Sequence, residues 1–128
     1  MKHSIIKNIT ILTFFALACF GCASNEQIPN DLTAQQLIQQ GQTAFEHSDY
    51  KLSLRYYNAV LERFPDDRAV CIESKYEIGH LYMKQKKYEA AKPIFQELLD
   101  LYANTLPGEL PPAYQKLAQI EMEKIEKR

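Results

Sequence analysis

Glycine is scarce in this chain, with four residues in 128. A loop that cradles phosphate needs several glycines close together, because its backbone amides must approach the anion closely. The sequence also lacks the glycine-flanked serine of a nucleophile elbow. Common sequence signatures of nucleotide binding and of serine-based acyl transfer are therefore absent.

Histidine is also scarce, and the three copies are His3, His47 and His80. Glu46-His47 does not continue into HExxH, and no cysteine or second histidine follows at metal-ligand spacing. Most carboxylates fall at expected helix starts or on polar helix faces, where solvation or capping explains them. The sequence therefore predicts no catalytic residue, no metal and no cofactor. The alternative is a hydrolase or ligand-binding protein that uses His80 and nearby carboxylates.

No basic stripe interrupts the mixed charges, and the net charge is −1 with a pI near 6.3. Nucleic-acid binding, which needs a concentrated positive surface, is therefore not expected. Alternation of apolar and polar residues at period two is missing as well, and β-branched residues are sparse after position 31. These absences favour an all-α fold.

Cysteine is rare too, and two of the three copies stand near the N-terminus, at Cys19 and Cys22. A short positive head is followed by an apolar run from Ile9 to Phe20, which is typical of a secretory signal and too short for a comfortable membrane span. The small residues around the cysteines resemble a bacterial lipobox. We therefore expect residues 1–21 to be a lipoprotein signal peptide and Cys22 to be lipidated, with Cys19 as the alternative. Lipidation at Cys22 removes Cys19 with the signal and blocks the Cys22 sulfur, which leaves Cys71 without a disulfide partner.

Residues 22–30 are polar and show no apolar period, which predicts a flexible tether. From Asp31 the spacing becomes helical, and the breaks at 48–49, 65–67, 86 and 104–111 separate five expected helices. The last of these starts at Pro111-Pro112 and ends near Lys127, and its expected apolar side holds Tyr114, Leu117, Ala118, Ile120 and Ile125.

The most informative feature is an internal repeat, whose two copies begin at Gly41 and at Gly79. The period is 38 residues, and a period between 20 and 50 residues indicates stacked supersecondary units. A unit of this kind buries its apolar face against a neighbour or a partner. The echoed pairs that follow are Tyr50 and Tyr88, Tyr57 and Phe95, Leu61 and Leu99, and Phe64 and Tyr102.

These residues, with Ser53, Ala91 and Pro65, resemble a tetratricopeptide repeat. The resemblance implies an all-α fold of helical hairpins: repeats over about 34–67 and 72–105, and a capping helix over about 111–127, within a domain at 31–128. The chain departs from the family pattern at Lys75, Gln40 and Ala103, and in its period of 38 rather than 34. Its elongated repeat and its lipobox together are also similar to those of envelope repeat proteins of the outer-membrane assembly lipoprotein and cell-division-coordinator kinds.

In this family, one face of each repeat's first helix lines a concave groove that binds a peptide or a helix. Carried over, the resemblance implies a partner-binding face in this chain. Its residues are Gln35, Ile38, Gln42, Phe45, Glu46, Glu73, Tyr76, His80, Met83 and Lys84.

Together these expectations describe a periplasmic lipoprotein, held by lipid at the outer membrane of a bacterial envelope, that binds a partner protein as a scaffold or assembly factor. The alternative function is a small structural subunit of a larger envelope or secretion complex.

Overall fold

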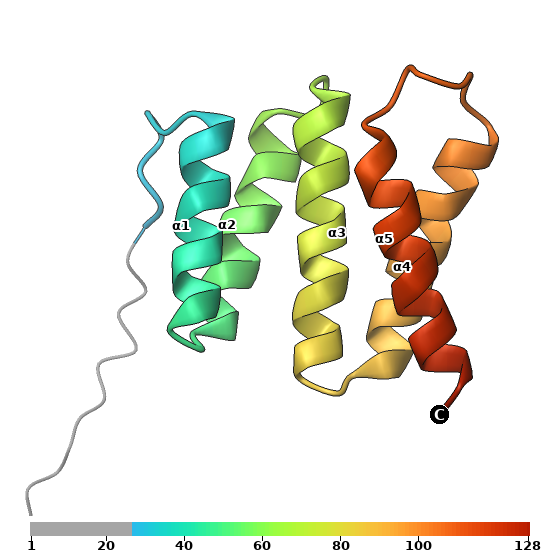
Figure 1. Ribbon diagram of the computed structural model, residues 1–128. Coiled ribbons are helices and arrows are strands. Elements are labelled where there is room, and N and C mark those ends of the chain that lie inside the picture. Colours follow the sequence, from blue (N-terminus) through green and yellow to red (C-terminus); the bar gives the residue numbers. More distant parts are fainter. Residues whose placement is uncertain (1–26) are drawn as a thin grey trace, which may run out of the picture.

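The computed structural model describes residues 27–128, and in this part of the chain all regular structure is helical (Figure 1). The expected all-α fold is therefore confirmed. The expected signal peptide, with Cys19 and Cys22, lies outside the described residues. The five helices are α1 (Ala34–Glu46), α2 (Tyr50–Arg63), α3 (Arg68–Lys84), α4 (Tyr88–Ala103) and α5 (Pro112–Glu126).

The helices form two layers, with α1, α3 and α5 in front and α2 and α4 behind them (Figure 1). Each helix packs against the next one in the chain, and the front helices also contact one another. Two apolar clusters fill the space between the layers, one centred on α1 and α2 and the other on α4 and α5. The central helix α3 contributes residues to both clusters and so joins the two halves.

Side-chain caps fix the starts of the first three helices. Thr33 accepts a hydrogen bond from the Gln36 amide at 3.3 Å, and the Gln36 side chain accepts one from the Thr33 amide at 2.9 Å. This capping box places the start of α1 at Ala34, later in the chain than the apolar spacing predicts. Asp49 and Asp67 cap α2 and α3 in the same manner, through their carboxylates.

The turn between the two helices of the first hairpin recurs in the second. Ser48 and Lys86 both take the left-handed conformation, with φ of 61° and 59°. The amide after each of them bonds back to the preceding helix, from Asp49 to the Ala44 carbonyl at 2.8 Å and from Lys87 to the Tyr82 carbonyl at 2.9 Å. This is the hydrogen-bond pattern of a Schellman motif, although neither turn uses glycine. The repeat therefore includes the backbone geometry of the turn, which the residue types at Ser48 and Lys86 do not predict.

Within each hairpin the two helices cross at a glycine. A Cβ atom on Gly41 would lie 2.6 Å from Tyr57 Cε1, and one on Gly79 would lie 2.7 Å from Phe95 Cε1. Both rings are fully buried. The aromatic ring of the second helix therefore occupies the space that any other side chain on the first helix would need.

Residues 28 and 29 are held against the helices, so the expected tether over residues 22–30 does not include them, and residues 22–26 lie outside the described residues. Arg63 donates hydrogen bonds to the Pro29 carbonyl at 2.6 Å and to the Ile28 carbonyl at 3.0 Å. Ile28 and Leu32 also pack against the α1–α2 cluster. Any free spacer must therefore end before Ile28.

The buried face of α5 differs from the expected one. Leu117 and Ile120 remain 37% and 38% exposed, whereas Glu121 and Met122 are 5% and 8% exposed. The face turned toward α3 and α4 carries Tyr114, Ala118, Glu121, Met122 and Ile125, which recur at spacings of three and four. Glu121 is tolerated there because Lys124 donates a hydrogen bond to its carboxylate at 2.9 Å.

Replacing Gly79 by alanine tests the helix crossing. We expect Gly79→Ala to lower the free energy of unfolding by about 1–3 kcal/mol, because the added methyl group must displace a buried ring. Urea unfolding of the purified protein measures the change, and the loss should be smaller when Phe95→Leu is also present. A neutral or stabilising Gly79→Ala, as helix propensity alone would give, would contradict the crossing.

Candidate functional site

The candidate site is the outer face of the front layer, called here the groove face, formed by α1, α3 and α5 (Figure 1). Several residues of the predicted partner-binding set are accessible on it. Gln35, Gln42, Glu46 and Lys84 are exposed, and Phe45, Glu73, His80 and Met83 are half-buried.

Ile38 and Tyr76 are corrections to the predicted set. Ile38 is 2% exposed within the α1–α2 cluster, and Tyr76 is 8% exposed within the cluster of α4 and α5. Tyr76 is covered because α5 brings the Tyr114 ring to 5.6 Å from its own, measured between centroids. Both residues belong to the core, so they support the groove face rather than offer a free surface.

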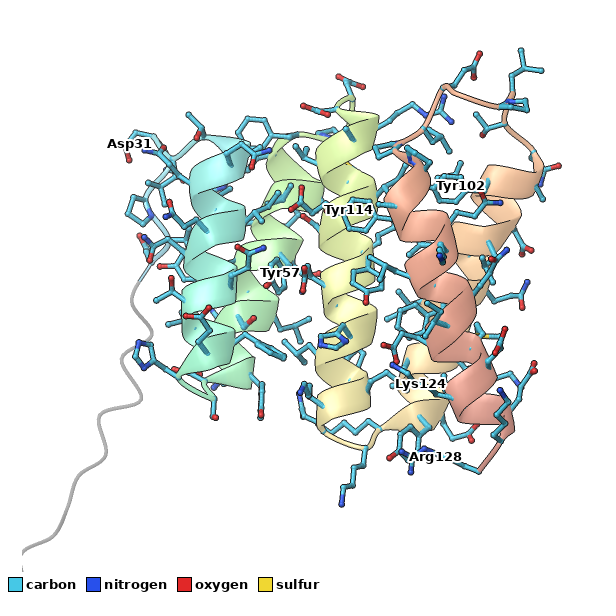
Figure 2. All side chains as sticks on the ribbon, in the orientation of Figure 1. Asp31, Tyr57, Tyr102, Tyr114, Lys124 and Arg128 are labelled. Carbon is cyan, nitrogen blue, oxygen red and sulfur yellow. The ribbon has the colours of Figure 1, made fainter. Side chains whose placement is uncertain are left out.

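A row of rings crosses beneath the groove face from α1 to α5. The Phe45 and His80 rings lie 5.7 Å apart, and the His80 and Tyr76 rings are stacked at 6.0 Å, between centroids. Tyr114 ends the row beyond Tyr76, in the space between α3 and α5 (Figure 2). This row links the three front helices and gives the groove face a rigid aromatic base.

The carboxylates of Glu73 and Glu77 on α3 lie next to the row of rings. Burial, followed by the charge of Glu73, raises the pKa of Glu77, while a hydrogen bond with the Gln42 side chain lowers it. Burial, followed by the charge of Glu73 and a hydrogen bond with it, raises the pKa of Tyr114. Glu77 was absent from the predicted set, and its signal was its position one helical turn after Glu73, on the same helix face.

A second charged group joins α3 to α5. His80 Nδ1 lies 3.7 Å from Glu121 Oε1, too far for a hydrogen bond, and has no hydrogen-bond partner among the described residues. Burial lowers the pKa of His80, and the positive charges of Lys84 and Lys124 add to this effect, while Glu121 opposes it. The imidazole is therefore favoured in its neutral form in the folded chain.

The charged residues are not arranged as a metal centre. Among residues 27–128, no group of three or more His, Cys, Asp or Glu side chains is placed to hold a metal ion. Cys71 donates its thiol hydrogen to the Phe64 carbonyl at 3.2 Å, and burial raises its thiol pKa, so it is a poor thiolate donor. In the same part of the chain, no helix is long and apolar enough to cross a membrane.

Comparison with known proteins finds a family match for the second hairpin. Residues 72–105, which hold α3 from Ile72 onward and all of α4, match the tetratricopeptide repeat family. The second hairpin is therefore similar to a tetratricopeptide repeat. The family is generally one of non-catalytic protein–protein interaction domains, so the hairpins indicate a binding scaffold.

A relative extends the comparison over most of the chain. An uncharacterized protein of Treponema pallidum (strain Nichols) is 30% identical over 112 residues, which are 88% of this chain and 45% of the relative. The chain thus spans less than half the length of this curated relative. Because the similar region is 88% of this chain, it includes at least part of both helical hairpins.

The buried histidine predicts how stability depends on pH. Because the folded state lowers the pKa of His80, the unfolded chain binds the proton first as the pH falls below about 6.5. The stability contributed by neutral His80 is therefore complete above that pH and is lost below it. We expect the wild-type protein to lose stability relative to His80→Gln between about pH 7.5 and pH 5.5.

Urea unfolding of both proteins across this range measures the difference, in which the titration of other groups largely cancels. His47→Gln is the matched control for removing an exposed histidine. A wild-type protein that gains stability relative to His80→Gln on acidification would show that attraction to Glu121 outweighs the burial of the imidazole.

Proposed function

We propose that this protein is a lipid-anchored periplasmic scaffold of tetratricopeptide repeats that binds a segment of a partner protein on its groove face. The observation that carries the proposal is the groove face itself. Three parallel helices expose polar and half-buried aromatic side chains above a packed row of rings, and this gives a partner a preformed surface. Binding to such a surface requires little ordering of the scaffold.

The anchor in this proposal rests on the N-terminal sequence. Lys2 and Lys7 precede the apolar run, and Gly21 precedes Cys22, as in bacterial lipoproteins. Ala23 rather than aspartate follows Cys22, which favours the outer membrane. Several acyl chains on one cysteine would hold the protein stably at a membrane, whereas one chain holds only marginally.

Photocrosslinking in cells tests the binding face. A photoreactive phenylalanine analogue placed at Gln42 or Lys84, both exposed on the groove face, should yield adducts with a partner protein. The matched controls are Lys51 on α2 and Lys92 on α4, which are exposed on the back layer. Adducts of equal yield from the back layer, or none from the groove face, would overturn the proposed function.

Single cysteine variants test the anchor. We expect Cys22→Ala to remove the acyl mass from the protein and to release it from the membrane fraction, while Cys19→Ala keeps both properties. Mass spectrometry of the mature N-terminus and fractionation of the cells measure these outcomes. Loss of the acyl group only in Cys19→Ala would assign the anchor to Cys19, and an unmodified wild-type protein would remove the anchor from the proposal.

A further inference from the structure

Glu73 and Glu77 form a like-charged pair that no ion pair among residues 27–128 includes. They stand one turn apart on α3, at a spacing where equal charges repel. No ion pair of the described chain includes either carboxylate, since the ion pair of α3 joins Lys75 to Glu97 and neutral His80 lies beside Glu121. The Tyr114 hydroxyl beside Glu73 and the Gln42 amide beside Glu77 are both neutral. Two half-buried negative charges are therefore held at the groove face without compensation.

A buried hydroxyl beneath the pair also lacks a partner. Tyr57 is fully buried, and its hydroxyl oxygen has no hydrogen-bond partner among the described residues. The charges of Glu77 and Glu73 both raise the pKa of this hydroxyl, after the larger effect of burial. The charges of both carboxylates therefore act on this buried hydroxyl.

An apolar stripe flanks the acidic pair on α5. Leu117 and Ile120 are two of the large hydrophobic side chains that stay exposed in the described chain. Leu117 lies about one helical turn after Tyr114 and one turn before Glu121, and both of these neighbours face α3. Helix geometry therefore places Leu117 along the α3 side of α5. Figure 2 shows Tyr114 and Lys124 on this side, between α3 and α5.

The opposite side of α5 has a different character. Its residues are all polar and exposed, so the outer edge of the helix array is suited to water rather than to another helix. The exposed Leu117 thus lies next to the groove rather than at the edge. The outer-edge residues are Gln115, Gln119, Glu123 and Glu126.

We propose that the surface between α3 and α5 binds a basic amphipathic segment of the partner protein. A lysine or arginine side chain of the segment pairs with Glu73 and Glu77, and its aliphatic side chains cover Leu117 and Ile120. Charge complementarity selects this occupant, because an acidic segment would meet two uncompensated carboxylates. This inference rests on the proposed function and specifies the chemistry of its partner.

A free metal ion is a poorer match for the same surface. Each carboxylate has one acidic neighbour, and no group of three potential ligands forms in the described chain. An ammonium or guanidinium group needs only the two carboxylates, and its carbon stem can pack against the Tyr114 ring.

Charge-reversal variants of the full chain test the proposal in cells. The photoreactive residue is placed at Leu117, and the crosslinked peptide is identified by mass spectrometry. We expect that peptide to belong to a partner protein and to contain lysine or arginine beside aliphatic residues. Glu77→Lys should reduce the adduct yield about tenfold, the loss typical of one charged hydrogen-bonded contact.

Matched variants separate an effect of charge on the adduct yield from an effect on folding. Glu77→Gln keeps the side-chain shape and removes the charge, so it should weaken the adduct while thermal unfolding shows a folded protein. Glu89→Lys changes an exposed carboxylate on α4 and should leave the yield within about twofold. Reversing the partner's basic residue to glutamate should restore the adduct with Glu77→Lys.

The outcomes distinguish this inference from the proposed function. If the yield of groove-face adducts does not depend on the charge at Glu77, the basic-segment inference alone is overturned. The same holds if the crosslinked peptide is acidic or uncharged. A crosslinked peptide from this chain itself also overturns it, since the occupant would then be a second copy or the chain's own leader. The absence of any groove-face adduct overturns the proposed function as well.

Discussion

The close crossing of helices at Gly41 and Gly79 is the constraint on which the rest of the structure depends. Because Tyr57 and Phe95 press directly on the glycine backbones, each hairpin has one possible separation and one angular setting. Equal hairpins that stack through α3 then bring α1, α3 and α5 into one layer (Figure 1). The groove face therefore depends on the absence of a side chain at Gly41 and at Gly79, and packing in the core sets its shape.

The repeat made most of the fold predictable from the sequence. Glycines and aromatics that recur at one constant interval defined both hairpins, and Asp49, Asp67 and Pro112 marked helix starts that the structure reproduces. The left-handed turns at Ser48 and Lys86 were not predictable, because both residues lack the usual glycine signal. The attachment of Ile28 was hidden as well, since it depends on an arginine at the far end of α2.

The candidate site was predictable only in part, for reasons of packing. The family resemblance placed Gln42, Glu73 and His80 on one side of α1 and α3, but it could not show that Tyr114 would cover Tyr76. Spacing also gave α5 a single apolar side, whereas the structure buries Glu121 and exposes Leu117. A charged residue can replace an apolar one at a buried position when neighbouring helices supply its partners, and those partners are known only after folding.

The two acidic regions of the groove face differ in what surrounds them. Glu121 is buried, but Lys124 bonds to it and His80 lies beside it, so its charge is compensated within the protein. Glu73 and Glu77 keep only neutral donors. The segment at Ile28 packs against one end of the helix array, and the outer edge of α5 at the other end is polar, so neither end needs a further helix. Uncompensated charge and exposed aliphatic surface thus remain together between α3 and α5, where a single basic amphipathic segment can satisfy both.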